Sequence, residues 1–269
     1  MSFKDKIISK LGPSEASGDR LDYYHNQLSA LYASISSDPV AVAHLTASNI
    51  SYLRSGLAPE TQIGAFRLIP IDFCRLFMVF NNARAGEHTK IWSARFSKRK
   101  SLEAPLGVYV TSCVPNLTHD QVRIGLFKRS PFDLFGQSLY MDHLKLNEEV
   151  SPPLLGTIAV SLSLITAYRV GIRSVRLFGA GGYNRFSGGW PKSKYWGYKV
   201  CPKFGFDAPL FREEIRDPRL RGFKTVSDVV KADPNLWSEV GFERMMEFDM
   251  SPNSQSWKTL IAYLQGKGF

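Results

Sequence analysis

One helix signal set between strand signals constrains the fold of this chain most strongly. Apolar residues recur at three- and four-residue spacing from Leu155 to Arg169, as they do along one side of a helix. Pro152 and Pro153 precede this segment and Gly171 follows it, and these residue types are common at helix starts and ends. The next run, VRLFGA, is typical of a buried strand that follows a crossover helix. We therefore expect a crossover helix over residues 155–169.

The sequence before this helix is typical of β-strands. Short runs rich in β-branched and aromatic residues alternate with turn-forming clusters such as AGEH, SLEAP, NLTHD and SPFDLFG. Strands that follow one another without a long helix between them favour antiparallel pairing, because parallel pairs need a crossover. After the crossover helix we expect a Gly-rich loop, a short aromatic helix and one more strand at GFDAPLF. The expected fold class is α+β, with a mainly antiparallel sheet and one crossover helix. The expected strands before the helix are GAFRLI, RLFMVFN, GVYVTSC, VRIGLF and SLYMDHLKL.

Both ends of the chain are predicted to be helical extensions of this core. In residues 1–60, apolar residues from Leu21 to Leu31 recur at helical spacing, and a second short helix is expected between Val40 and Leu53. Residues 61–216 form the α+β core. Residues 217–269 contain two short helix signals and a final helix at WKTLIAYLQ. This last segment is too short for a core of its own, so we expect it to pack on the main domain.

Composition excludes several classes of protein. The chain has 269 residues, of which 44% are hydrophobic and 13% aromatic, so it can bury a core and is too apolar for general disorder. It has no apolar run long enough to span a membrane and no secretory signal at its start. Three cysteines and five scattered histidines lack metal-binding spacing. We expect a protein of the cytoplasm, or one delivered into another cell without a classical signal peptide.

The net charge of +10 is concentrated in one segment. Residues 151–206 contain no Asp or Glu and carry eight of the Lys and Arg residues. Such a stretch is either a solvated basic surface or a surface that attracts phosphate. The phosphate reading predicts a phosphate-bearing ligand or cofactor, or a nucleic acid, as partner. The eight cations are Arg169, Arg173, Arg176, Arg185, Lys192, Lys194, Lys199 and Lys203.

Residues 138–211 resemble the second half of the fold of the GNAT superfamily of N-acetyltransferases. The family pattern is an antiparallel strand, a phosphate-binding loop and helix, a strand, a short helix carrying a Tyr, and Leu-Gly-Phe before a last strand. The counterparts in order are SLYMDHLKL, SPPLLGTIAVSLSLITAYRVGI, SVRLFGA and KSKYWGYKVCPKFGFDAPL. The resemblance implies an acyltransferase that moves a small acyl group from a phosphate-bearing cofactor to an amine.

The resemblance also implies roles for individual residues. Tyr198 would be the general acid, and Asp142 or Glu148 would be the base, acting through water. The cofactor phosphates would lie at the start of the helix, at residues 155–157. The cofactor-binding residues there are Leu155, Gly156 and Thr157.

The phosphate-binding loop departs from the family pattern in a way that bears on acyl-CoA. The family loop reads Gln/Arg-x-x-Gly-x-Gly/Ala, whereas this chain has Leu154 in place of the first Gly and keeps only Gly156. Pro152 and Pro153 have no N–H to donate, so this loop offers fewer hydrogen bonds to a pyrophosphate. Acyl-CoA is therefore the implied cofactor, with the two prolines as the argument against it.

A Gly-rich loop follows the strand VRLFGA. Its glycines, including Gly181 and Gly182, allow a ligand to approach the main chain, and Asn184 and Arg185 would contact that ligand. The loop has neither the Gly-Lys-Ser/Thr of a Walker loop nor the spacing of a dinucleotide fingerprint. The alternative is a surface loop without a ligand.

The segment after this loop supports a second class of function. Aromatic residues alternate there with cations, which is the composition of grooves that bind single-stranded nucleic acid. A basic nucleic-acid-associated, effector or assembly protein would use the fold for binding, without acyl-CoA chemistry. The alternative is aromatic packing beneath a solvated surface. The polyanion-binding residues on this reading are Lys192, Lys194, Trp196 and Lys199.

Overall fold

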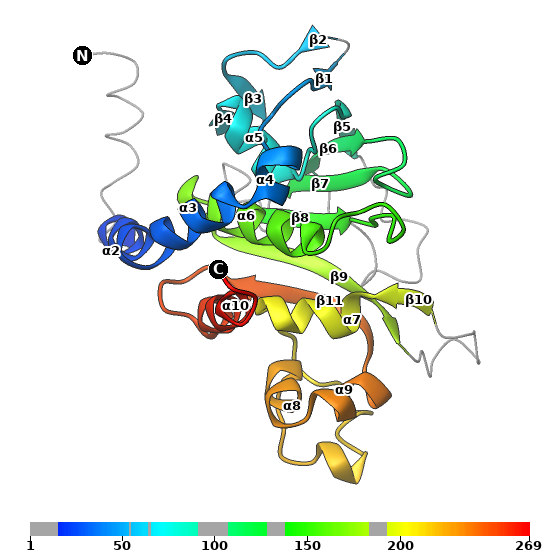
Figure 1. Ribbon diagram of the computed structural model, residues 1–269. Helices are drawn as coiled ribbons and strands as arrows, with labels where there is room; N and C mark the ends of the chain where they lie inside the picture. Colours follow the sequence, from blue (N-terminus) through cyan, green and yellow to red (C-terminus); the bar gives the residue numbers. More distant parts are fainter. Residues whose placement is uncertain (1–15, 54, 64–65, 91–106, 128–137, 183–192) are drawn as a thin grey trace.

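The computed structural model describes residues 16–53, 55–63, 66–90, 107–127, 138–182 and 193–269. Within these ranges, nine strands form one sheet in the order β10-β9-β8-β7-β6-β5-β1-β2, and β11 pairs with β9 (Figure 1). The strands are β1 (Ser51–Tyr52), β2 (Ser55–Gly56), β5 (Arg84–Lys90), β6 (Gly107–Cys113), β7 (Val122–Phe127), β8 (Ser138–His143), β9 (Ser174–Gly182), β10 (Ser193–Trp196) and β11 (Phe242–Asp249). A separate antiparallel pair is formed by β3 (Thr61–Ile63) and β4 (Phe66–Leu68).

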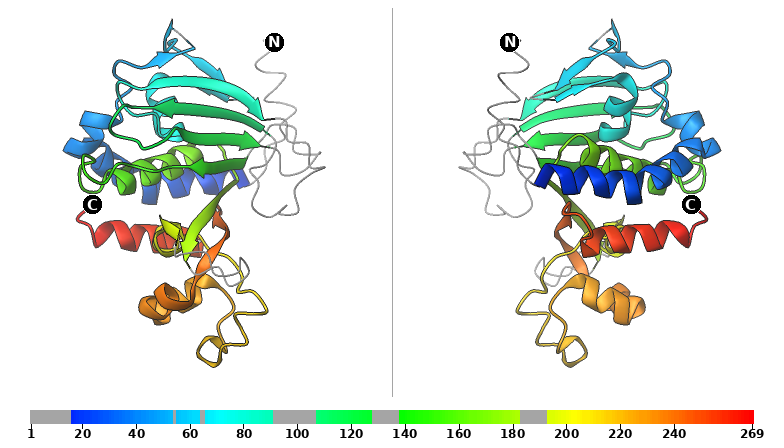
Figure 2. Two further views of the ribbon diagram at one scale, coloured as in Figure 1. Left: turned by 90° about the vertical axis from the view of Figure 1, so that its right-hand side faces the viewer. Right: turned by 90° about the vertical axis from the view of Figure 1, so that its left-hand side faces the viewer.

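The fold is α+β, as predicted. Neighbouring strands of the main sheet pair antiparallel except for β8–β9 and β1–β5, which are parallel. Helices α3, α4, α6 and α10 lie on one side of the sheet (Figure 2). The helices are α2 (Ala16–Tyr23), the π-helical turn η1 (Tyr24–Leu28), α3 (Ser29–Ser37), α4 (Pro39–His44), α5 (Pro70–Phe77), α6 (Leu155–Arg169), α7 (Gly197–Val200), α8 (Val226–Ala232), α9 (Pro234–Val240) and α10 (Gln255–Gln265), with the 3-10 turns η2 (Cys201–Phe204) and η3 (Pro218–Leu220).

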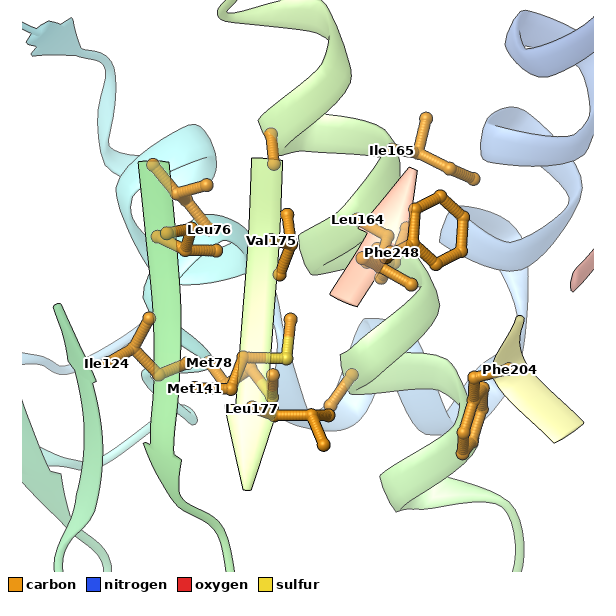
Figure 3. Close-up of a cluster of buried hydrophobic side chains, with 14 of the residues drawn as sticks. Leu76, Met78, Ile124, Met141, Leu164, Ile165, Val175, Leu177, Phe204 and Phe248 are labelled. Atoms are coloured by element: carbon orange, nitrogen blue, oxygen red, sulfur yellow. The ribbon is translucent and has the colours of Figure 1, made fainter. Parts of the chain in front are cut away.

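Helix α6 is the predicted crossover helix and lies at the centre of the core. It connects β8 to the parallel strand β9, and it packs against α3, α4 and α5. Leu164 and Ile165 lie with Val175 and Phe248 in the buried cluster of Figure 3. Helix α6 is buried on nearly all sides, and the hydroxyls of Ser161 and Thr166 have no hydrogen-bond partner among the described residues. The Ser163 hydroxyl donates to the carbonyl oxygen of Leu76 at 2.7 Å.

Helix α2 is hydrogen-bonded to the C-terminal end of α6. The Arg20 side chain on α2 donates from Nε to the carbonyl oxygen of Tyr168 at 3.0 Å, and its guanidinium also donates to the carbonyl oxygen of Ile172. A cation at a helix C-terminus satisfies orphan carbonyls and complements the helix dipole. Leu28, the last residue of the π-helical turn η1, is buried, whereas Leu21 in α2 is 57% exposed.

Two expected elements in the first half of the chain are wrong. RLFMVFN was expected to be a strand, but most of it lies in helix α5 and the turn that ends it. Pro70 starts this helix with its fixed backbone angle, and packing against α6 outweighs the strand preference of the aromatic residues. AGEH was expected to be a turn, but it lies inside β5, which pairs along its full length with β6.

The last strand of the sheet comes from the C-terminal segment and was missed. GFDAPLF contains no strand, and its contributions are isolated bridges from Asp207 to Glu247 and from Pro209 to Thr225. The strand beside β9 is β11, whose alternating burial is that of an ordinary sheet strand. Residues 217–269 therefore contribute a strand as well as helices. The expected helices there are present, and α8 has a capping box between Thr225 and Asp228.

Candidate functional site

The parallel ladder between β8 and β9 ends before either strand does. Its last pair is Met141 and Leu177, while β8 continues to His143 and β9 to Gly182. Met141 is 8% and Leu177 is 7% exposed, whereas Leu139 and Val175, the pair two residues earlier, are fully buried. Figure 3 shows these two side chains next to each other. In α/β sheets, ligand sites form at the carboxyl ends of parallel strands, and this ladder end is such a place.

Helix α6 begins at the same end of the sheet, because residues 144–154 lead from the end of β8 into it. Its first turn has no side-chain cap. Within the described residues, two N–H groups of this turn have a backbone partner. The N–H of Leu155 donates to the carbonyl oxygen of Pro152 at 3.2 Å, and the N–H of Ile158 donates to that of Leu154 at 2.8 Å. The N–H groups of Gly156 and Thr157 remain as donors, at the positive end of the helix dipole.

The residue before this turn adopts an unusual backbone conformation. Leu154 has φ of 65°, which is the left-handed region that glycine favours. The loop therefore keeps a glycine-like bend at the position where the sequence has Leu154 instead of the Gly of the family pattern. Gly156 itself has space around it, since an added Cβ would lie 3.5 Å from Leu146 Cδ1. The predicted residues Leu155, Gly156 and Thr157 thus form the first turn of α6.

Charged residues meet at the end of β8. The Arg123 side chain on β7 donates from Nε to Asp142 Oδ2 at 2.8 Å. The register between β7 and β8 shifts here, so that Arg123 pairs with His143 while Ile124 pairs with Met141. This bulge leaves Asp142 and His143 both beside Arg123, although strict alternation predicts opposite faces for them.

His143 carries a buried nitrogen. Its Nε2 has no hydrogen-bond partner among the described residues, and the Asp120 carboxylate lies 3.6 Å away. Burial lowers the pKa of His143, and the positive charge of Arg123 lowers it further, against the opposing effects of Asp120 and Asp142. The imidazole is therefore neutral at pH 7 and can accept a proton.

Two buried phenols, one on β6 and one on β8, lie close enough to Asp142 for its charge to act on both. Tyr109 on β6 and Tyr140 on β8 are buried with Phe127 in a second hydrophobic cluster, separate from the main core. The Tyr109 ring occupies the space over Gly125, where a Cβ would lie 2.4 Å from it. Burial raises the pKa of both phenols, and the charge of Asp142 raises it further. Both side chains are therefore neutral hydrogen-bond donors.

The hydroxyl of Tyr198, the predicted general acid, already has a partner. It donates to the carbonyl oxygen of Ser238 on α9 at 3.1 Å, and the Tyr198 side chain is buried. The indole Nε1 of Trp237 donates to the carbonyl oxygen of Tyr198 at 2.9 Å. These contacts attach α7 to α9. Glu148, the other predicted base, is exposed in the turn that follows β8.

The glycines of the predicted loop serve the packing of β9. Gly181 has φ of 112° and Gly182 has φ of 85°, both in the region that favours glycine. A Cβ on Gly182 would lie 2.4 Å from the carbonyl oxygen of Gly241, the residue before β11. Residue 182 therefore has to be a glycine for these two backbone segments to lie so close together. Some predicted residues lie outside the described residues: Asn184, Arg185 and Lys192, together with the side chain of Lys194.

Trp196 and Lys199, predicted to bind a polyanion, are close together. Trp196 is 60% exposed, and Lys199 Nζ lies 5.2 Å from the centre of its ring. Cys201, near them, has a pKa raised to about 12 by burial, so its thiol is not a nucleophile at neutral pH.

Sequence reasoning missed Arg123 and the left-handed Leu154. The Arg123 contact has no local sequence signal, because it depends on a bulge between β7 and β8. A leucine is likewise no signal for a left-handed backbone conformation. In the part of the chain that the structure describes, no three His, Cys, Asp or Glu residues form a group suited to a metal ion. None of the described helices is long and apolar enough to cross a membrane. Comparison with protein-family models and with curated proteins gives no match to this chain.

Proposed function

We propose that this protein is a divergent GNAT-like acyltransferase that moves a small acyl group from acyl-CoA to an amine. The observation that carries the proposal is the end of the β8–β9 ladder, at which α6 begins with two free backbone donors. A helix N-terminus at the carboxyl end of a parallel strand pair is a favourable place for the phosphates of a cofactor.

The order of elements supports the family assignment. An antiparallel strand (β8), a loop and helix (α6), a parallel strand (β9) and a short helix with a Tyr (α7) follow one another as in the family pattern. The left-handed Leu154 supports it further, because the loop keeps the bend for which the family uses glycine. Pro152 and Pro153 have no N–H to donate to a pyrophosphate, but the N–H groups available at this turn are those of Gly156 and Thr157, which follow the prolines.

Acyl-CoA would supply the acyl group as a reactive thioester. The N–H groups of Gly156 and Thr157 would hold its phosphates. At the end of β8, His143 Nε2 or the Asp142 carboxylate would accept the proton that the amine loses, directly or through water. The sulfur that departs needs a proton, and Tyr198 can supply it only if its hydroxyl leaves the carbonyl of Ser238.

A thermal unfolding experiment with acetyl-CoA tests this proposal. Because a ligand that binds the folded state stabilises it, a concentration about 100 times Kd adds about 2.7 kcal/mol and raises Tm. S-acetylpantetheine, which lacks the pyrophosphate, is the matched control and should raise Tm much less. An unchanged Tm at saturating acetyl-CoA overturns the proposal.

A further inference from the structure

The helical stretch from α7 into η2 and the residue before it carry an exposed Trp196, a half-buried Lys199 and an exposed Lys203. Trp196 immediately precedes the stretch, Lys199 lies three residues later, and Lys203 four residues after that. Trp196 is the last residue of β10, Lys199 lies in α7 and Lys203 in the 3-10 turn η2. We call Trp196, Lys199 and Lys203 the Trp–Lys strip.

The strip combines an open aromatic ring with positive charge. Trp196 is 60% exposed, which is high for so large an apolar side chain, and Lys203 is also exposed. Lys199 Nζ lies 5.2 Å from the Trp196 ring centre and 5.5 Å from that of Tyr198, so both rings fix its position.

No negative charge in the described surroundings cancels these cations. Neither Lys199 nor Lys203 forms an ion pair within the described part of the chain, and residues 151–206 contain no carboxylate side chain. The carboxylate of Glu239 on α9, next to the Tyr198 partner Ser238, is engaged by Arg219 at 2.9 Å.

We propose that the Trp–Lys strip binds single-stranded nucleic acid. A base would stack on the open face of Trp196, and backbone phosphates would contact Lys199 and Lys203. An anionic membrane is less well matched, since insertion needs several exposed apolar side chains and the neighbours Tyr198 and Phe204 are buried. The proposal does not rest on acyl transfer and concerns a different surface.

The test is the binding of fluorescein-labelled oligothymidine to the full-length protein, measured by anisotropy over a range of salt concentrations. Trp196→Ala should weaken binding about 5- to 150-fold, which corresponds to the loss of one stacked base. Lys199→Gln and Lys203→Gln should each reduce the slope of log K against log salt by about 0.7. Lys231→Gln on α8 and Leu53→Ala are the matched exposed controls and should bind as the unsubstituted protein does.

Four results overturn the proposal, three with oligothymidine and one with vesicles. The first is no binding of oligothymidine by the unsubstituted protein at low salt. The second is equal binding by Trp196→Ala and Leu53→Ala when circular dichroism shows both folded. The third is loss of oligothymidine binding in saturating acetyl-CoA, which would assign the strip to the nucleotide of a cofactor. A parallel measurement with anionic phosphatidylserine vesicles should show no dependence on Trp196, and such a dependence would instead assign the strip to membranes.

Discussion

Met141 and Leu177 are the last residues that pair across β8 and β9, and beyond them the two parallel strands continue without a shared ladder. The neighbouring backbone groups of β9 are taken up further along by β10, which pairs at Gly181 and Gly182. The parallel ladder thus ends between two paired parts of one sheet. Asp142 and His143 end β8, and residues 144–154 lead from there to the first turn of α6, so the charged residues and the unbonded N–H groups of Gly156 and Thr157 lie on consecutive segments of the chain.

The hydrogen bond from Tyr198 to Ser238 favours a structural role for this phenol. We expect Tyr198→Phe to lower the free energy of unfolding by about 1 kcal/mol, because a part-buried hydrogen bond is lost. Acetyl-CoA should still raise the Tm of this variant as much as that of the unsubstituted protein. Urea unfolding and thermal unfolding measure the two effects. Unchanged stability together with a fall in acyl transfer of about 100-fold or more would instead establish Tyr198 as the general acid.

His143 should make stability depend on pH below neutrality. Its pKa in the folded protein lies below the ordinary value of 6.5, so the unfolded chain takes up a proton first as the pH falls. The stability contribution of the neutral imidazole is complete above pH 6.5 and is lost as the pH falls from 6.5 toward the lowered pKa.

Urea unfolding of His143→Gln across this range is the measurement for that prediction. The variant should lose less stability than the unsubstituted protein between pH 7 and pH 5, because it has no imidazole to protonate. The charges that influence His143 are those of Arg123, Asp120, Asp142 and Lys145, all unchanged in the variant. Parallel pH profiles for both proteins would contradict the lowered pKa.

Arg244 on β11 forms a buried ion pair that should be hard to break. Its guanidinium donates to both carboxylate oxygens of Glu214, one of them at 3.0 Å, and lies within 4.8 Å of the ring centres of Phe211, Trp237 and Phe242. Arg244→Met leaves the Glu214 carboxylate buried and unpaired, so it should lower the free energy of unfolding by about 3–5 kcal/mol.

A double-mutant cycle measures the coupling energy between Arg244 and Glu214 apart from the cost of leaving one buried charge without its partner. Arg244→Met with Glu214→Leu should cost much less than the sum of the two single changes, because no unpaired charge remains. Urea unfolding of the four proteins gives the coupling. Additive effects would show that the two side chains do not stabilise each other.

Local patterns predicted the elements whose structure depends on nearby residues. The crossover helix from Leu155 to Arg169 has the predicted bounds, since its apolar spacing and its flanking Pro and Gly residues are all local signals. α5 and β5 were misjudged because packing against α6 and pairing with β6 decide them, and neither is visible in a short window.

The candidate site shows the same limit. Asp142 and Gly156 could be selected from their positions after a strand and at a helix start. The Arg123 partner of Asp142 depends on a bulge between two strands, and the Ser238 partner of Tyr198 lies 40 residues further along the chain. These partners determine whether the Asp142 carboxylate and the Tyr198 hydroxyl are available for proton transfer, and they are known only from the folded structure.

Binding of acetyl-CoA to Gly156→Asp tests the central claim most directly. A Cβ at residue 156 has room, since it would lie 3.5 Å from Leu146 Cδ1. A carboxylate in the first turn of α6 is favoured by the helix dipole but repels the phosphates of the cofactor. Gln255→Asp makes the same kind of change at the start of α10 and is the matched control. By isothermal titration calorimetry, the unsubstituted protein and Gln255→Asp should bind acetyl-CoA equally. Gly156→Asp should bind at least about ten-fold more weakly, since hydrogen bonds to charged groups contribute about 1.5–3 kcal/mol each. Equal affinity in all three proteins would contradict the account.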